Sequence, residues 1–301
     1  MADSQIATVR ALLASLPRPE GLAARRARLV ALTSQYAIPA DVRLQAVDAG
    51  GVRAEWTTTP VAHTQRAMLF LHGGAYIAGG IESHRHLVAQ AGRVARVRTL
   101  ALDYRLAPEH PFPAALDDAL AGYHYLLSQG YAPGELVLAG ESAGGGLALA
   151  TLVALRDAGT PLPGCVWLSS PWTDLAMSGE SMLSKADVDP LIQKPYLLEA
   201  AAAYLHGAEP RTPLASPLFA DLRGLPPLLI QVGTAETLLD DSIRLARAAA
   251  LADVRVELQT WPEMIHAWTL YYPQLDDGAR ALDAMGAFVQ HTLDAAAQRA
   301  S

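Results

Sequence analysis

The chain has 301 residues, of which 51% are apolar and 18% charged, and its formal net charge is −7. This composition is typical of a globular protein with a sizeable core, and the acidic balance argues against a nucleic-acid partner, whose phosphates need a basic surface. No stretch approaches the length of a membrane span, and the first residues lack the basic segment of a signal peptide, so we expect a cytoplasmic protein. The single cysteine, Cys165, allows no internal disulfide and is expected in the core.

The first 60 residues predict two helices followed by a strand pair. Residues 4–16 carry apolar side chains at helical spacing, and residues 21–36 form a second helical pattern after Pro17 and Pro19. Residues 42–47 and 52–56 alternate between apolar and polar types, with two glycines between them. This pattern is typical of an antiparallel pair at the edge of a sheet.

From residue 66 onward, apolar strands and helices alternate. The strands are continuous apolar runs, which suit a parallel sheet buried on both faces: 68–71, 99–102, 136–139, 166–168 and 228–232. Helical patterns follow them at 83–95, 113–128, 146–157, 238–252 and 276–297, and an alternating run at 254–258 reads as an edge strand. We therefore predict an α/β fold with a mostly parallel, eight-stranded sheet and helices on both faces, whose active site lies at the carboxyl ends of the strands.

One segment is too long for a simple crossover between strands. Residues 172–216 separate two strands and contain a helical stretch at 196–205. We expect this segment and the N-terminal residues 1–40 to form a helical cap over the strand ends. The catalytic domain would then comprise residues 41–301, with 172–216 contributing to the cap.

A nucleophile is indicated by the pentapeptide Gly-Glu-Ser-Ala-Gly at 140–144. It lies between the strand 136–139 and a helix rich in alanine and leucine. A serine on such a sharp strand-to-helix turn exposes its hydroxyl, and the helix N-terminus behind it favours developing negative charge. We therefore expect Ser142 to be the nucleophile.

A nucleophilic serine needs a base and an orienting carboxylate, which follow it in the chain order Ser, acid, His. His266 lies in a loop after the alternating run 254–258, and Glu236 lies just past the strand 228–232. Both positions follow the carboxyl end of a strand, where parallel sheets place their active sites. Asp240 and Asp241 follow within five residues and are alternative candidates for the acid.

Backbone N–H groups must also stabilise the oxyanion. The residue after the nucleophile, Ala143, supplies one. The others are expected from the loop His72-Gly73-Gly74-Ala75-Tyr76, which follows the strand 68–71 and whose adjacent glycines let the backbone approach a substrate. We expect Glu141 and the turn 103–105 to form a structural network that braces the serine turn.

Taken together, these motifs resemble the hormone-sensitive-lipase-like branch of the α/β-hydrolase esterases. The resemblance covers roughly residues 66–290 and includes the oxyanion loop, the Tyr-Arg-Leu-Ala-Pro-Glu signature at 104–109, the serine turn at 140–145 and the histidine. It implies that Ser142, Glu236 and His266 form a catalytic triad. It further implies that the N–H groups of Gly74, Ala75 and Ala143 form an oxyanion hole whose loop Gly73 also lines.

Two departures from the family pattern affect the site. Ala75 stands where a third glycine is usual, but its N–H survives the change. Glu236-Thr237-Leu238 stands where the family more often carries Asp-Pro-Leu, so the acid has a longer arm.

The resemblance implies a carboxylester hydrolase that cleaves small, short-acyl esters through an acyl-enzyme, with neither cofactor nor metal. A lactone hydrolase would use the same triad, so the partner is a small ester or lactone. A catalytically inactive receptor is a further alternative, but such receptors have lost the histidine that this chain keeps at position 266. The edge strand 254–258 and the helix 276–297 also allow a homodimer.

Overall fold

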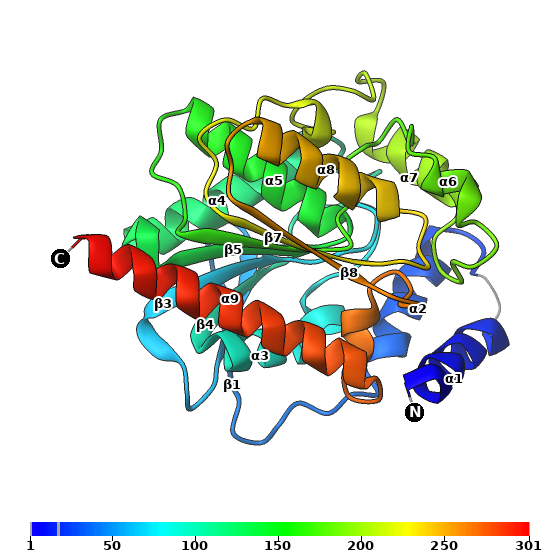
Figure 1. The fold of residues 1–301 in the computed structure, drawn as a ribbon, viewed down its shortest axis with the longest axis horizontal. Helices are drawn as coiled ribbons and strands as arrows, with labels where there is room; N and C mark the ends of the chain where they lie inside the picture. Colours follow the sequence, from blue (N-terminus) through cyan, green and yellow to red (C-terminus); the bar gives the residue numbers. More distant parts are fainter. Residues whose placement is uncertain (1, 17–18, 301) are drawn as a thin grey trace.

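The computed structural model describes residues 2–16 and 19–300, which form a central eight-stranded sheet with helices on both faces (Figure 1). The strand order is β1-β2-β4-β3-β5-β6-β7-β8. The first two pairings, β1 with β2 and β2 with β4, are antiparallel, and all others are parallel. The strands are β1 (Arg43–Asp48), β2 (Arg53–Thr58), β3 (His63–Leu71), β4 (Val97–Leu102), β5 (Leu136–Glu141), β6 (Cys165–Ser169), β7 (Leu228–Gly233) and β8 (Val256–Trp261).

Two apolar cores lie on the two faces of this sheet. Along β3, Met68 and Phe70 belong to one core, and Leu69 and Leu71 to the other, because successive side chains of a strand point to opposite faces. Helices α3 and α9 cover one face, while α4, α5 and α8 cover the other (Figure 1). The helices are α1 (Ala2–Ser15), α2 (Leu22–Thr33), α3 (Ile81–Ala95), α4 (Ala114–Ser128), α5 (Ala143–Asp157), α6 (Ser181–Ser184), α7 (Lys194–Leu205), α8 (Leu239–Leu251) and α9 (Asp276–Ala300).

The structure confirms the predicted α/β fold and shifts several element boundaries, among them those of α5 and β8. Helix α5 begins at Ala143 rather than at residue 146, so the glycines that follow the serine turn are helical. Strand β8 covers 256–261 rather than 254–258 because its register is set by β7, where Leu228 pairs with Val256 and Gly233 with Trp261. This pairing leaves β8 at one edge of the sheet, as expected for an alternating strand.

Helices α1, α2, α6 and α7 gather at one end of the molecule (Figure 1). Arg10 of α1 donates to the backbone oxygens of Val188 and Glu263, which ties the N-terminal segment to the 172–216 segment and to the loop after β8. The division into a cap and a catalytic domain at residue 40 stays a prediction. Among the described helices, none combines the length and the apolar character needed to cross a bilayer.

Candidate active site

Ser142 lies at the turn between β5 and α5, with backbone angles φ 55° and ψ −121°. Its N–H donates to the backbone oxygen of Ser169, and its own carbonyl accepts from the N–H of Trp172. The end of β6 and the residues that follow it therefore hold the turn in place. Gly144 is required here because a Cβ at this position would lie 2.0 Å from the carbonyl oxygen of Leu71. The tight packing of β3 against α5 thus depends on the second glycine of the pentapeptide.

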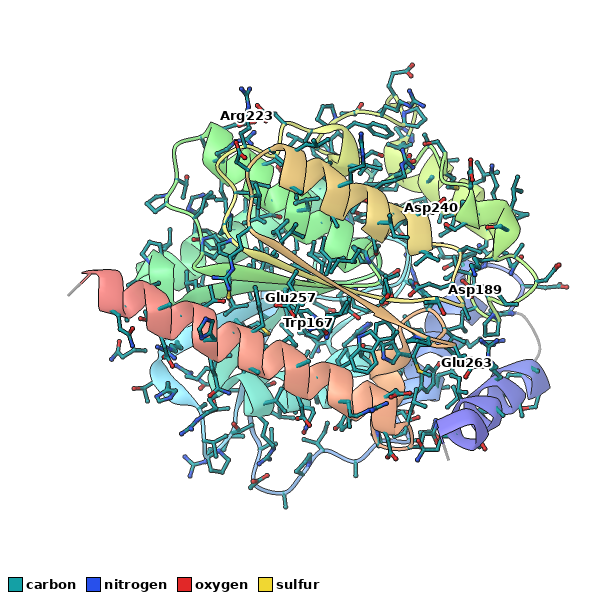
Figure 2. All side chains as sticks on the ribbon, viewed as in Figure 1. Trp167, Asp189, Arg223, Asp240, Glu257 and Glu263 are labelled. Carbon is teal, nitrogen blue, oxygen red and sulfur yellow. The ribbon has the colours of Figure 1, made fainter. Side chains whose placement is uncertain are left out.

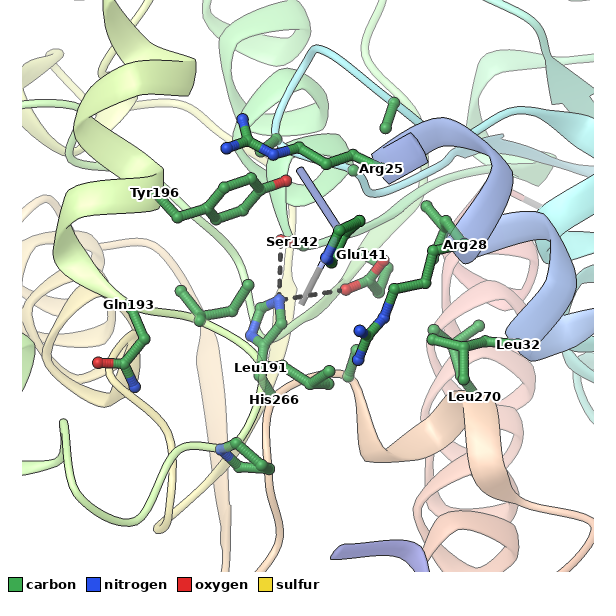
Figure 3. Close-up of a pocket in the computed structure, with 18 of the residues that line it drawn as sticks. Arg25, Arg28, Leu32, Glu141, Ser142, Leu191, Gln193, Tyr196, His266 and Leu270 are labelled. Atoms are coloured by element: carbon green, nitrogen blue, oxygen red, sulfur yellow. Dashed lines mark hydrogen bonds and ion pairs between the residues drawn. The ribbon is translucent and has the colours of Figure 1, made fainter. Parts of the chain in front are cut away.

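An unbroken chain of hydrogen bonds joins the three side chains expected to form the triad. His266 Nε2 lies 2.9 Å from Ser142 Oγ (Figure 3). On the other side of the ring, His266 Nδ1 lies 2.7 Å from Glu236 Oε2. All three side chains are buried, and each comes from a segment that follows a parallel strand. Because the carboxylate accepts a hydrogen bond from Nδ1–H, Nε2 carries no proton and is free to accept the serine proton.

Glu236 is fixed on its other side as well. Its Oε1 accepts from the Gly233 N–H at 2.6 Å and from the Ser170 hydroxyl at 2.9 Å. Burial raises the pKa of the Glu236 carboxyl, and the hydrogen bond to His266 opposes that rise. For His266, burial lowers the pKa, but the hydrogen bond and charge of Glu236, with the charges of Glu141 and Asp189, outweigh it and raise the value to about 9. The site therefore stabilises the imidazolium that forms when serine gives up its proton.

The two alternative acids hold a different part of the structure. Asp240 accepts from the Ser181 N–H at 2.8 Å, and Asp241 accepts from the N–H groups of Thr173 and Asp174 at 2.7 and 2.9 Å. Both carboxylates thus fasten the 172–184 stretch to α8, and Asp240 lies at the end of α8 next to α6 (Figure 2). Of the three candidates, only Glu236 is in hydrogen-bonding distance of His266.

The loop after β3 places backbone N–H groups beside Ser142. Gly74, with φ 120°, and Ala75, with φ 56°, turn the chain so that both residues line the same cavity as the serine. The N–H of Ala143, the first residue of α5, has no intrahelical acceptor in the usual helix pattern. Gly73 lines the loop too, but its N–H donates to His84 Nε2 at 3.3 Å. The arrangement leaves Gly74, Ala75 and Ala143 as candidate oxyanion donors.

A mostly apolar cavity of about 400 Å³ opens above the serine. Its wall opposite the sheet is shared by α2 and by the segment 190–199 (Figure 3). Arg25 of α2 joins these two parts, because its guanidinium lies 2.8 Å from Glu199 and 5.1 Å from the ring centre of Tyr196. Of the aromatic residues near the site, Tyr196 lines the cavity, whereas Tyr76 and Tyr204 stack on each other in the core at 3.8 Å.

The expected network between Glu141 and the turn 103–105 is not the one that forms. Asp103 pairs with Arg53 and Arg105 pairs with Asp118, while the Tyr104 hydroxyl donates to the His72 carbonyl and so supports the oxyanion loop. Glu141 instead contacts two histidines. Its Oε2 lies 3.2 Å from His84 Nε2, and its Oε1 lies 3.6 Å from His266 Nε2.

Comparison with known proteins agrees with this geometry. A model of the α/β hydrolase fold family matches residues 68–270. An acetyl-hydrolase of Streptomyces hygroscopicus is 49% identical over 252 residues, which cover 84% of this chain and 83% of that protein. A putative acetyl-hydrolase of Mycobacterium tuberculosis, LipR, is 36% identical over 92% of this chain and 89% of its own.

Solved structures show the same relationship. An esterase from the bacterial hormone-sensitive lipase family matches with a TM-score of 0.93 and 42% identity, covering 97% of this chain and 98% of that one. The esterase EstE5, soaked with p-nitrophenyl butyrate, matches with a TM-score of 0.93 and 40% identity over 96% and 99% of the two chains. The chain therefore belongs to the α/β-hydrolase fold family, and its resemblance to the hormone-sensitive-lipase-like esterases is confirmed.

Proposed function

We propose that this protein is a carboxylester hydrolase that works through an acyl-enzyme at Ser142. The observation that carries the proposal is the hydrogen-bond chain from Glu236 through His266 to Ser142 at the floor of a mostly apolar cavity. An inactive receptor is disfavoured because the histidine is present and within bonding distance of the serine. The names of the related proteins, acetyl-hydrolases and esterases, support the same reaction class.

In the proposed reaction, His266 Nε2 takes the hydroxyl proton of Ser142 as Oγ attacks the ester carbonyl carbon. The oxyanion that forms accepts hydrogen bonds from the N–H groups of Gly74, Ala75 and Ala143. His266 then gives its proton to the leaving alcohol, and the acyl group stays on Oγ. Glu236 holds the Nδ1–H tautomer throughout and stabilises the transient imidazolium, without taking the proton itself.

The size of the cavity favours small substrates. Its volume of about 400 Å³ lies near the lower end of the range for small-molecule sites, roughly 300–1,000 Å³. A relative named acetyl-hydrolase and a similar esterase soaked with p-nitrophenyl butyrate support a short acyl chain. A panel of p-nitrophenyl esters of rising acyl length tests this preference, and a seven-membered lactone in the same panel measures cleavage of cyclic esters.

The test of the nucleophile is covalent labelling. An organophosphonate directed at active-site serines should modify Ser142, as shown by peptide mass spectrometry. Ser142→Ala should lower kcat by about 10⁶-fold, the loss seen when a triad serine is removed. Ser128→Ala, at the exposed end of α4, is the matched control and should keep wild-type kcat. Unchanged hydrolysis by Ser142→Ala would rule out the mechanism.

We also propose a homodimer formed through β8 and α9. The position of β8 at the edge of the sheet supports this assembly, because one side of that strand has no partner among the described strands. Light scattering during size-exclusion chromatography would give the mass in solution, and a monomer at high protein concentration would contradict it. The cytoplasmic location stays a prediction, which fractionation of the producing cells would test.

A further inference from the structure

The carboxylate of Glu141 lies within the site, although acylation as described makes no use of it. Glu141 ends β5, is only 3% exposed, and lines the same cavity as Ser142 and His266. His266 Nε2 therefore has two oxygen neighbours, Ser142 Oγ at 2.9 Å and Glu141 Oε1 at 3.6 Å (Figure 3). A carboxylate so close to the proton-transfer atom is costly to bury unless its oxygens are used.

The two oxygens of Glu141 face different neighbours. Oε2 lies 3.2 Å from His84 Nε2, on α3, and His84 is held in turn by Ser83 through Nδ1 at 2.8 Å. Because His84 Nε2 accepts from the Gly73 N–H, it lies beside Oε2 without donating to it. Oε1 is the oxygen nearer to His266, at a distance that is too long for a good direct hydrogen bond. A water molecule next to Nε2 would be within reach of both atoms.

Acylation and deacylation differ in the number of protons on the nucleophile that lies beside His266 Nε2. In acylation the nucleophile is Ser142, whose single hydroxyl proton goes to His266. In deacylation the nucleophile is water, which has two O–H groups. One proton passes to His266 Nε2, and the other needs an acceptor inside a cavity whose walls are mostly apolar.

We infer that Glu141 positions the hydrolytic water of the deacylation step, with Oε1 accepting the O–H group that is not transferred to His266. This inference rests on the proposed acyl-enzyme at Ser142. The geometry meets its main requirement, because the acceptor Oε1 lies 3.6 Å from His266 Nε2 on a side chain that is buried in the site.

The step balances without any further reactant. The water oxygen bonds to the carbonyl carbon of the acyl-enzyme while one water proton moves to His266 Nε2 and the carbonyl electron pair moves to the oxyanion. The intermediate then collapses, the bond from carbon to Ser142 Oγ breaks, and Oγ takes the proton from His266. The product leaves as a carboxylic acid that keeps the second water proton. Glu141 takes up no proton at any point in this step.

An alcohol provides the discriminating test. Methanol can also attack the acyl-enzyme, but its only O–H proton goes to His266, so it has no second proton to offer Glu141. The ratio of methyl ester to free acid formed from p-nitrophenyl acetate in added methanol therefore reports on this contact. A change that acts through His266 or the serine turn slows both nucleophiles alike and leaves the ratio unaltered.

We expect Glu141→Met, which removes both oxygens at a similar side-chain volume, to raise the methanolysis-to-hydrolysis ratio by about 10-fold or more, the effect of losing one hydrogen bond to a charged group. Glu141→Asp keeps the charge but withdraws the oxygens, so it should raise the ratio as well. In stopped-flow experiments both variants should keep the burst of p-nitrophenol and lose steady-state rate. Glu257→Gln removes a carboxylate from the exposed side of β8 and is the control, with a wild-type ratio.

The outcomes separate this inference from the proposed function. A wild-type ratio in either Glu141 variant that folds, as judged by circular dichroism, would overturn the inference, even if both rates fell. If the wild-type enzyme gave neither a burst nor any methyl ester, the acyl-enzyme itself would be in doubt.

Discussion

Replacement of Glu236 by glutamine tests the acid of the triad and leaves the volume of the side chain almost unchanged. In the wild type, Oε1 accepts two hydrogen bonds, from Gly233 and Ser170, and Oε2 accepts one from the Nδ1–H of His266. The amide oxygen of glutamine would take the Oε1 position, because only an acceptor fits there. Its NH₂ group would then face His266 Nδ1.

That orientation reverses the histidine tautomer. An NH₂ donor opposite Nδ1 makes this nitrogen an acceptor, so the ring proton moves to Nε2, which can then no longer accept the proton of Ser142. The analogous change of aspartate to asparagine in a serine-protease triad lowers kcat by about 10⁴-fold, and we expect a similar loss here. Such a loss corresponds to about 5 kcal/mol of transition-state stabilisation.

The assay is the steady-state hydrolysis of p-nitrophenyl acetate by folded Glu236→Gln. Asp240→Asn is the matched control, since Asp240 lies on the neighbouring helix and bonds to Ser181 rather than to His266. It should keep kcat within a few-fold of the wild type. A kcat within about tenfold of the wild type for Glu236→Gln, or a greater loss for Asp240→Asn, would refute the assignment.

Three further predictions concern Gly144, His266 and Asp241. Gly144→Ala should lose nearly all activity and lower the Tm, because the new Cβ would lie 2.0 Å from the Leu71 carbonyl oxygen, whereas Gly134→Ala enters open space and should be tolerated. The value of kcat/KM should rise with pH up to the His266 pKa of about 9, since this base acts only after losing its proton. An apparent pKa at or below 6.5 in that profile would contradict this reasoning. Burial raises the pKa of the Asp241 carboxyl to about 7, so its contribution to stability is present below about pH 4 and is lost as pH rises toward 7. Asp241→Asn keeps an oxygen for the two N–H donors, and its Tm should fall less than that of the wild type between pH 4 and 8, as followed by thermal melts; equal losses of Tm would contradict this account.

Much of this site could be predicted from the sequence because its parts follow strands. Continuous apolar runs locate the parallel strands, and their carboxyl ends must meet at one edge of the sheet. Ser142, Glu236 and His266 each come soon after such a strand. Their positions along the chain therefore predict that the three side chains meet at one site. The choice of Glu236 over Asp240 and Asp241 needed the structure, since helix α8 turns the two aspartates toward the 172–184 stretch.

The surroundings of Glu141 could not be predicted for a physical reason. Its neighbour His84 lies 57 positions away on helix α3, and no local periodicity reports on such a contact. The start of α5 was missed because its run of glycines reads as a loop. These helical positions need glycine because neighbouring parts of the chain approach too closely for a side chain, which is a property of the packed fold.

The backbone of Ser142 has a consequence for how stable this protein can become. A φ of 55° with a ψ of −121° suits glycine and costs other residues about 1–3 kcal/mol. Globular proteins have net free energies of unfolding of only about 5–15 kcal/mol. The backbone strain at this one turn is therefore a sizeable fraction of the net stability. Substitution of Ser142 by glycine would relax the turn and remove the nucleophile together. Greater thermal resistance and catalysis therefore compete at this residue, and stabilising changes that preserve activity must be sought elsewhere in the chain.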